Sequence, residues 1–121
     1  MTREAIVGAA VAGAYSPAVI AEGKLVFVAG QGPLRDGVYV PGSIEEETRL
    51  TLDNVGALLE QAGSGFEHAI RCGVWLTDLS EFAGMNGVYE SFFPEPRPAR
   101  ATVGAGLLIG KVEIDCVALV P

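Results

Sequence analysis

Residues 43–62 constrain the fold more than any other segment, because they predict one amphipathic helix with both ends marked. Ser43 can accept a hydrogen bond from the amides of the first turn, and Glu46 completes a capping box three residues later. Gly63 follows as the residue type that ends a helix. One stripe of the segment is apolar or small, and it consists of Ile44, Thr48, Thr51, Leu52, Val55, Leu58, Leu59 and Ala62. Another layer of the fold has to cover this stripe.

Segments of alternating polarity predict a sheet as that layer. The clearest of them are residues 69–77, 99–106 and 112–120. The N-terminal part of the chain gives weaker signals of the same kind. They predict a weak strand over residues 5–13, a hairpin of residues 18–20 with 24–29, and a short strand over residues 37–40.

Residues 78–93 predict a second helix, with Asp78 as its cap, Glu81 as the third helical residue and Pro94 after its end. A chain of 121 residues fits one domain, which we expect to span residues 1–121. The order of elements indicates an α/β protein of the α+β kind, with a mixed sheet and both helices packed on one face. The other face would carry Trp75, Val117 and Leu119. We expect another subunit to cover so much apolar surface.

Composition argues against several classes of function. The chain has 15 acidic and 8 basic residues, a formal net charge of −7 and no basic cluster, so nucleic acid is not an expected partner. Its apolar stretches are interrupted well before the roughly 18 residues of a membrane span. Residues 5–14 faintly resemble a signal peptide, but Glu4 spoils the basic start, so we expect a cytoplasmic protein.

The two cysteines are expected to be reduced core thiols. Cys72 and Cys116 lie in alternating apolar segments, where free cysteine behaves as a small hydrophobic residue. His68 is the only histidine, and the chain has no C-x-x-C motif. We therefore expect no metal site.

The last two predicted strands carry the one constellation with evident chemistry. If they pair as a hairpin, one register puts Arg100, Thr102, Lys111, Glu113 and Asp115 together on the face without helices. An arginine can hold a planar carboxylate through two parallel hydrogen bonds. A nearby carboxylate can orient or deprotonate a water molecule. The pattern alone nevertheless favours a simpler interpretation, an ion pair between Arg100 and Glu113 at a subunit interface.

Two other polar residues allow two interpretations each. Tyr15 supplies either a hydroxyl to a site or a ring to the packing. Asn86 either belongs to a site or forms a surface or helix-to-loop contact. The standard nucleotide, serine-hydrolase and zinc-protease motifs do not occur in the sequence.

Six stretches of the chain together carry a family resemblance. They are Y-S-P-A-V from Tyr15, V-F-V-A-G-Q-G-P from Val26, T-L-D-N-V-G-A-L-L-E-Q-A-G from Thr51, L-T-D-L-S-E-F-A-G-M-N-G-V-Y-E-S-F-F from Leu76, P-A-R-A-T-V from Pro98 and V-E-I-D-C-V-A from Val112. In this order, and over nearly the whole chain, they resemble the RidA family. This family is also called YjgF, or the reactive intermediate imine deaminases.

The resemblance implies a chorismate-mutase-like fold in a barrel-like homotrimer, with three clefts between subunits. It implies hydrolysis of enamine or imine acids such as 2-aminoacrylate and 2-iminopropionate to a 2-keto acid and ammonia, without a metal or organic cofactor. By position it makes Arg100 the carboxylate-binding arginine and Glu113 the water-positioning glutamate. It makes Tyr15 the site tyrosine and Asn86 the site asparagine.

The chain also departs from the family pattern. Ala29, before Gly30 of the substrate site, stands where a serine is usual, and Thr102 stands where cysteine is common. Leu107, Leu108 and Ile109 replace the usual L-P turn. These changes leave open a second function, a non-catalytic trimer that binds a small carboxylate or regulates a partner. A third possible function is that of an endoribonuclease or translation inhibitor, a label that some relatives carry. The net charge of this chain disfavours that function.

Overall fold

The central sheet forms from the segments of alternating polarity. In the computed structural model, which describes residues 2–121, its strand order is β3-β8-β6-β7. The strands are β3 (Leu25–Gln31), β8 (Val112–Leu119), β6 (Ala69–Leu76) and β7 (Ala99–Gly104). β6 and β7 run parallel, and the other neighbours are antiparallel. The predicted mixed sheet is confirmed.

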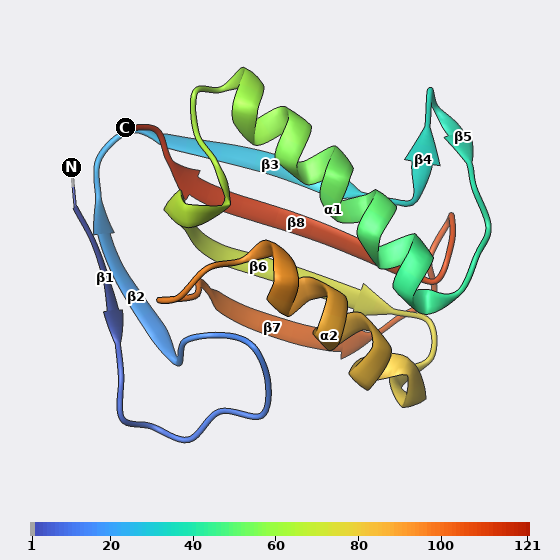
Figure 1. Cartoon of the computed structure of the whole chain (residues 1–121), viewed down its shortest axis with the longest axis horizontal. Coiled ribbons are helices and arrows are strands. Elements are labelled where there is room, and N and C mark those ends of the chain that lie inside the picture. The colour runs from blue at the N-terminus through green and yellow to red at the C-terminus, as the bar shows by residue number, and fades with distance from the viewer. Residues whose placement is uncertain (1) are drawn as a thin grey trace.

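Both long helices, α1 (Ile44–Gln61) and α2 (Phe82–Phe92), lie across one face of this sheet (Figure 1). α1 begins as predicted, because Ser43 Oγ accepts from the Glu46 amide at 3.1 Å and Glu46 Oε1 accepts from the Ser43 amide at 2.9 Å. Gly63 follows its end with a φ of 78°. The expected α+β fold with helices on one face is confirmed. No helix among residues 2–121 is long and apolar enough to cross a membrane.

The second helix begins one turn later than the sequence predicts. A 3₁₀ turn, η2 (Leu79–Glu81), precedes α2. Asp78 Oδ1 accepts from the Ser80 amide at 2.9 Å. A side chain bonded to the amide two residues on favours a tight turn over a regular first helical turn. A second 3₁₀ turn, η1 (Phe66–His68), leads from α1 into β6.

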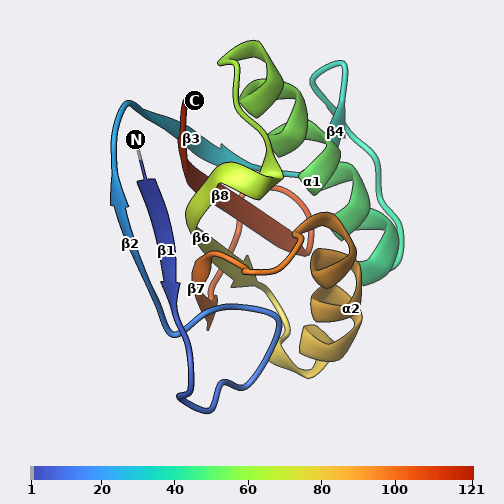
Figure 2. The ribbon, with the colours of Figure 1, turned by 60° about the vertical axis from the view of Figure 1, so that its left-hand side comes forward.

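Two N-terminal predictions are wrong. β1 (Thr2–Ile6) and β2 (Ala18–Glu22) pair with each other and form a ribbon beside the sheet (Figure 2). The strand predicted over residues 5–13 therefore stops at Ile6, and residues 7–13 are irregular. The predicted hairpin with residues 24–29 does not form, because β3 pairs with β8, where Val28 lies opposite the buried Cys116. A small hairpin, β4 (Leu34–Arg35) with β5 (Val38–Tyr39), accounts for the strand signal at residues 37–40.

The predicted pairing of the last two strands is also wrong. β7 and β8 flank β6 on opposite sides and do not pair with each other. The connection through α2 brings β7 back parallel to β6, as a strand–helix–strand unit does, and β8 takes the other edge of β6. Arg100 and Thr102 are consequently the cross-strand partners of Cys72 and Val74, and they lie on the face that the helices cover. Glu113 and Asp115 are the cross-strand partners of Trp75 and Gly73, and they lie on the opposite face.

The two cysteines belong to the core between sheet and helices. Cys72 and Cys116 are direct partners across β6 and β8, and both are free and fully buried. The hydrogen-bonding contact with Cys72, together with burial, raises the pKa of the Cys116 thiol far above its ordinary value. Because only the thiolate is reactive, this thiol is chemically inert.

The face without helices leaves apolar side chains in solvent. Phe27 is 72% exposed and Val103 is 47% exposed, while Trp75 and Val117 are half-buried. Leu119, which we expected to be uncovered, is already buried within the chain. Large exposed apolar side chains on a sheet face, here interspersed with the charged residues Glu113 and Asp115, are characteristic of an interaction surface.

Candidate active site

Arg100 lies among three aromatic rings at the edge of the sheet. Its Cζ is 4.7 Å from the ring centroid of Tyr89, 4.8 Å from that of Tyr15 and 5.4 Å from that of Phe82. Desolvation by this packing lowers the pKa of the guanidinium, which nevertheless stays charged near neutral pH. The rings attract the cation through their faces and fix its plane.

The hydrogen bonds of Arg100 use only one of its terminal nitrogens. Nη1 donates to Asn86 Oδ1 at 2.9 Å. Nε and Nη2 are buried and find no acceptor within the described residues. Such buried and unpaired donors are costly in a folded protein, so their presence is a sign of a binding function.

The irregular segment of residues 7–16 closes over this arginine. The Ala14 amide donates to Asn86 Oδ1 at 3.1 Å, and the Ser16 amide donates to the Pro98 carbonyl at 3.0 Å. Asn86 thus connects α2 with β7 and with this segment. Its bond to the Ala14 amide is a helix-to-loop contact, one of the two interpretations that the sequence allowed. A cavity of about 180 Å³ remains, lined by Ala12, Tyr15, Phe82, Arg100 and Thr102.

The other predicted site residues lie on the face without helices. The Glu113 side chain lies against Gly30 of β3. A Cβ atom added to Gly30 would be 2.5 Å from Glu113 Oε2. The missing side chain of Gly30 is therefore what lets the carboxylate lie there. Ala29 is the exposed residue beside it, and its carbonyl accepts from the Gln31 side chain at 2.9 Å.

The predicted site residues thus form two groups. Tyr15, Asn86, Arg100 and Thr102 meet at the β7 edge, on the side of the helices. Gly30 and Glu113 meet on the opposite side of the sheet, and Ala29 is the exposed residue before Gly30. No role was predicted from the sequence for Phe82, Tyr89 or Gly13, although Phe82 and Tyr89 share one stripe of α2. The signal for the two rings was available, because the same stripe of α2 that carries them also carries Asn86.

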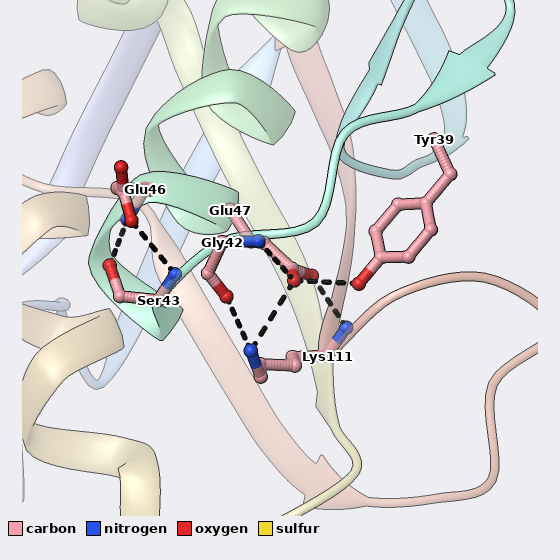
Figure 3. A network of polar contacts seen from close by, with 6 residues as sticks. All are labelled: Tyr39, Gly42, Ser43, Glu46, Glu47 and Lys111. Carbon is pink, nitrogen blue, oxygen red and sulfur yellow. Dashed lines mark hydrogen bonds and ion pairs between the residues drawn. The ribbon is translucent and has the colours of Figure 1, made fainter.

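The buried carboxylate of Glu47 holds the backbone just before β8 (Figure 3). It binds the amide of Lys111, which lies two residues before Glu113. Glu47 has a side chain without any exposed surface. Its Oε2 accepts from the Tyr39 hydroxyl at 2.7 Å and the Gly42 amide at 3.2 Å, and its Oε1 accepts from the Lys111 amide at 2.8 Å. Lys111 Nζ lies 3.6 Å from Oε2. The hydrogen bond to Glu47 raises the pKa of Tyr39.

We expect Glu47→Gln to lower the free energy of unfolding by about 2–4 kcal/mol. The glutamine NH2 group would place a donor where a carboxylate oxygen now accepts hydrogen bonds from the Tyr39 hydroxyl or a backbone amide. Urea unfolding measures the change. Glu45→Gln is the matched control, since Glu45 is exposed in the same helical turn and should change stability by less than about 0.5 kcal/mol. Equal stability of the two variants would show that the buried network contributes nothing.

Together these features define an α+β protein with an aromatic-lined cavity beside a buried arginine at the edge of its sheet. The family model described as endoribonuclease L-PSP matches residues 5–120, and the chain belongs to this family, which is the RidA/YjgF family.

Individual relatives agree with this assignment. The mitochondrial protein mmf2 of Schizosaccharomyces pombe is 45% identical over 111 residues, covering 88% of this chain and 87% of the relative. A protein of Capra hircus named 2-iminobutanoate/2-iminopropanoate deaminase is 34% identical, covering 88% and 80%. The crystal structure of a putative endoribonuclease from Thermotoga maritima superimposes with a TM-score of 0.75 at 36% identity, covering 88% and 87%.

Proposed function

We propose that this chain is a cofactor-free hydrolytic deaminase of reactive enamine and imine acids of the 2-aminoacrylate and 2-iminopropionate type. The observation that carries the proposal is the buried guanidinium of Arg100, whose Nε and Nη2 lack partners among residues 2–121. A small planar carboxylate supplies the two acceptors that this edge needs. The name of the Capra hircus relative supports the same class of substrate.

The proposed reaction adds water across the carbon–nitrogen double bond of the iminium acid. Water attacks the carbon, the resulting tetrahedral aminoalcohol loses ammonia, and a 2-keto acid remains. Arg100 fixes the position and plane of the substrate carboxylate. Glu113 accepts a hydrogen bond from the attacking water, takes one of its protons and passes that proton to the amino group. Ammonia then leaves as the carbonyl forms, and Glu113 takes the remaining hydroxyl proton, which leaves the site as part of ammonium. Tyr15 shapes the cavity on the arginine side.

One chain cannot present both charged residues to one ligand, because Arg100 and Glu113 lie on opposite faces of its sheet. We therefore propose a homotrimer in which the face without helices packs against the next subunit. Each cleft would combine Tyr15, Asn86, Arg100 and Thr102 of one chain with Ala29, Gly30 and Glu113 of its neighbour. The exposed Phe27 and Val103 support this packing.

We expect light scattering to give the mass of a trimer at micromolar concentration. Phe27→Glu should convert the protein to monomers, because it places a charge in the buried interface. Val38→Glu is the matched control, since Val38 is similarly exposed but lies on the small β4–β5 hairpin. A monomeric wild type, or a trimer that tolerates Phe27→Glu, would contradict the packing.

The function itself is tested by ammonia release from 2-iminopropionate, generated in the assay by an amino-acid oxidase acting on alanine. We expect the protein to accelerate ammonia release above the spontaneous rate. Binding of 2-oxobutyrate without any acceleration would favour the non-catalytic carboxylate-binding protein instead.

Ribonuclease activity is another candidate function, because both the description of the family model and the name of the Thermotoga maritima protein contain the word endoribonuclease. The net charge of −7 argues against it, since RNA binding depends on neutralising phosphates with basic residues. We also propose a cytoplasmic location, which fractionation would test against the organelles named for some relatives.

A further inference from the structure

Glu113 lies at the start of β8, where the pairing with one neighbouring strand is irregular. β8 begins one residue before Glu113, and on the β6 side Glu113 pairs in regular register. On the β3 side the register shifts between Val28 and Gln31, and the last pair joins Gln31 to Ile114. Among residues 2–121, β3 therefore offers Glu113 no cross-strand partner. The position of this carboxylate depends on the β6 pairing and on what holds the chain just before β8.

The residue before β8 is held at its amide, its carbonyl and its side chain. Glu47 Oε1 accepts from the Lys111 amide at 2.8 Å, and the Lys111 carbonyl accepts from the Thr77 amide at 3.1 Å. Lys111 Nζ donates to the Gly42 carbonyl and lies 3.6 Å from Glu47 Oε2 (Figure 3). The chain is therefore fixed in place two residues before Glu113.

Glu47 is fixed by its other contacts. Its side chain has no exposed surface. The Tyr39 hydroxyl donates to Oε2 at 2.7 Å, and the Gly42 amide donates to the same oxygen at 3.2 Å. Glu47 also belongs to the first turn of α1, whose start is held by the capping box of Ser43 and Glu46. A carboxylate held in this way gives the backbone before β8 a rigid acceptor.

The second segment that contacts Glu113 also reaches this carboxylate. The Glu113 side chain lies against Gly30 of β3, and Pro33 follows three residues later. A Cβ atom on Gly110 would be 2.7 Å from Pro33 Cγ and 2.9 Å from Glu47 Oε1. The chain at Gly110 is thus packed between Pro33 and Glu47, and both segments next to Glu113 converge on Glu47.

We infer that Glu47 is a positioning residue for the proposed hydrolysis, because its bond to the Lys111 amide fixes the Glu113 carboxylate that takes a proton from water. The inference rests on the proposed function. Stability alone does not account for a buried carboxylate here, since apolar residues of similar volume are often as stabilising as a buried ion pair. A misplacement of about 1 Å can slow a reaction about a hundredfold. Glu47 therefore acts on kcat through Glu113 and leaves the Arg100 side of the site unchanged.

The test separates turnover from ligand binding in Glu47→Gln. It measures kcat for ammonia release from 2-iminopropionate, and the dissociation constant for 2-oxobutyrate by calorimetric titration. We expect kcat to fall on the order of tenfold or more, whereas the dissociation constant stays within about threefold of wild type, since Arg100 of β7 binds the carboxylate. Glu47→Asp keeps the charge but withdraws it by one methylene group, and it should show the same separation.

Leu59→Ala is the matched control for the loss of stability. Leu59 is fully buried near the other end of α1, and its truncation to alanine costs a comparable amount of stability. The bond between Glu47 and the Lys111 amide lies at the opposite end of the helix. Leu59→Ala should therefore keep kcat within about twofold of wild type.

The remaining outcomes overturn the inference. A Glu47→Gln variant with the kcat of wild type would show that Glu113 keeps its position without the carboxylate. An equal loss of kcat in Leu59→Ala, a parallel loss of affinity for 2-oxobutyrate, or failure of both Glu47 variants to fold would assign Glu47 a structural role only. If wild type itself does not accelerate ammonia release, the proposed function fails first and the inference falls with it.

Discussion

Arg100→Ala is expected to lower kcat/KM for 2-iminopropionate by about 10²–10⁴-fold. The substitution removes two charge-assisted hydrogen bonds to the substrate carboxylate, each contributing about 1.5–3 kcal/mol. Arg100→Lys should recover little of the loss, since an ammonium group offers a point charge without the planar fork. Ammonia release measures both variants.

The matched control for this prediction is Arg35→Ala, which removes an exposed arginine from β4. It should leave activity within a factor of about two, and all variants should keep the oligomeric state of wild type. Full activity of Arg100→Ala would contradict the assignment of the carboxylate site.

Glu113→Gln is expected to slow kcat by about 10²–10⁴-fold, the usual contribution of a general base, because the amide cannot take a proton from water. The affinity for 2-oxobutyrate should stay within about threefold of wild type, since Arg100 provides the carboxylate contacts. Steady-state kinetics and calorimetric titration separate the two effects.

Glu67→Gln, at an exposed position in η1, controls for the loss of one negative charge. A Glu113→Gln variant that loses ligand affinity while keeping kcat would place Glu113 among the binding groups and would remove it from the hydrolytic step.

The sequence was sufficient to predict the elements that local patterns encode. The capping box of Ser43 and Glu46 marks where α1 begins, and the alternation around Cys72 and Cys116 marks β6 and β8. These signals act within a few residues of each other, so they can be interpreted without knowing what packs against them.

Strand pairing was not predictable from the same signals. Alternation shows which residues share a face, but it does not show which strand lies alongside, so the hairpin of β7 with β8 was a plausible error. The correct signal was the strand–helix–strand order of β6, α2 and β7, which favours a parallel pair. The error placed Arg100 and Glu113 on one face, whereas they lie on opposite faces.

The arginine site was predictable only in part. The resemblance assigned Arg100, Tyr15 and Asn86, but the close approach of Gly13 depends on how an irregular segment folds back. No periodic pattern encodes such a segment. The buried Glu47 was missed for a related reason, since its partners Tyr39 and Lys111 lie in a short hairpin and a loop.

The central claim is that each site combines Arg100 of one subunit with Glu113 of the next. It is tested most directly by refolding Arg100→Ala and Glu113→Gln together in equal amounts and measuring ammonia release from the mixed trimers. A Glu113→Gln subunit supplies an intact Arg100, and an Arg100→Ala neighbour supplies an intact Glu113. Random mixing should restore about a quarter of the sites, and with them about a quarter of wild-type activity. Activity no higher than that of the two variants refolded separately would contradict the shared site.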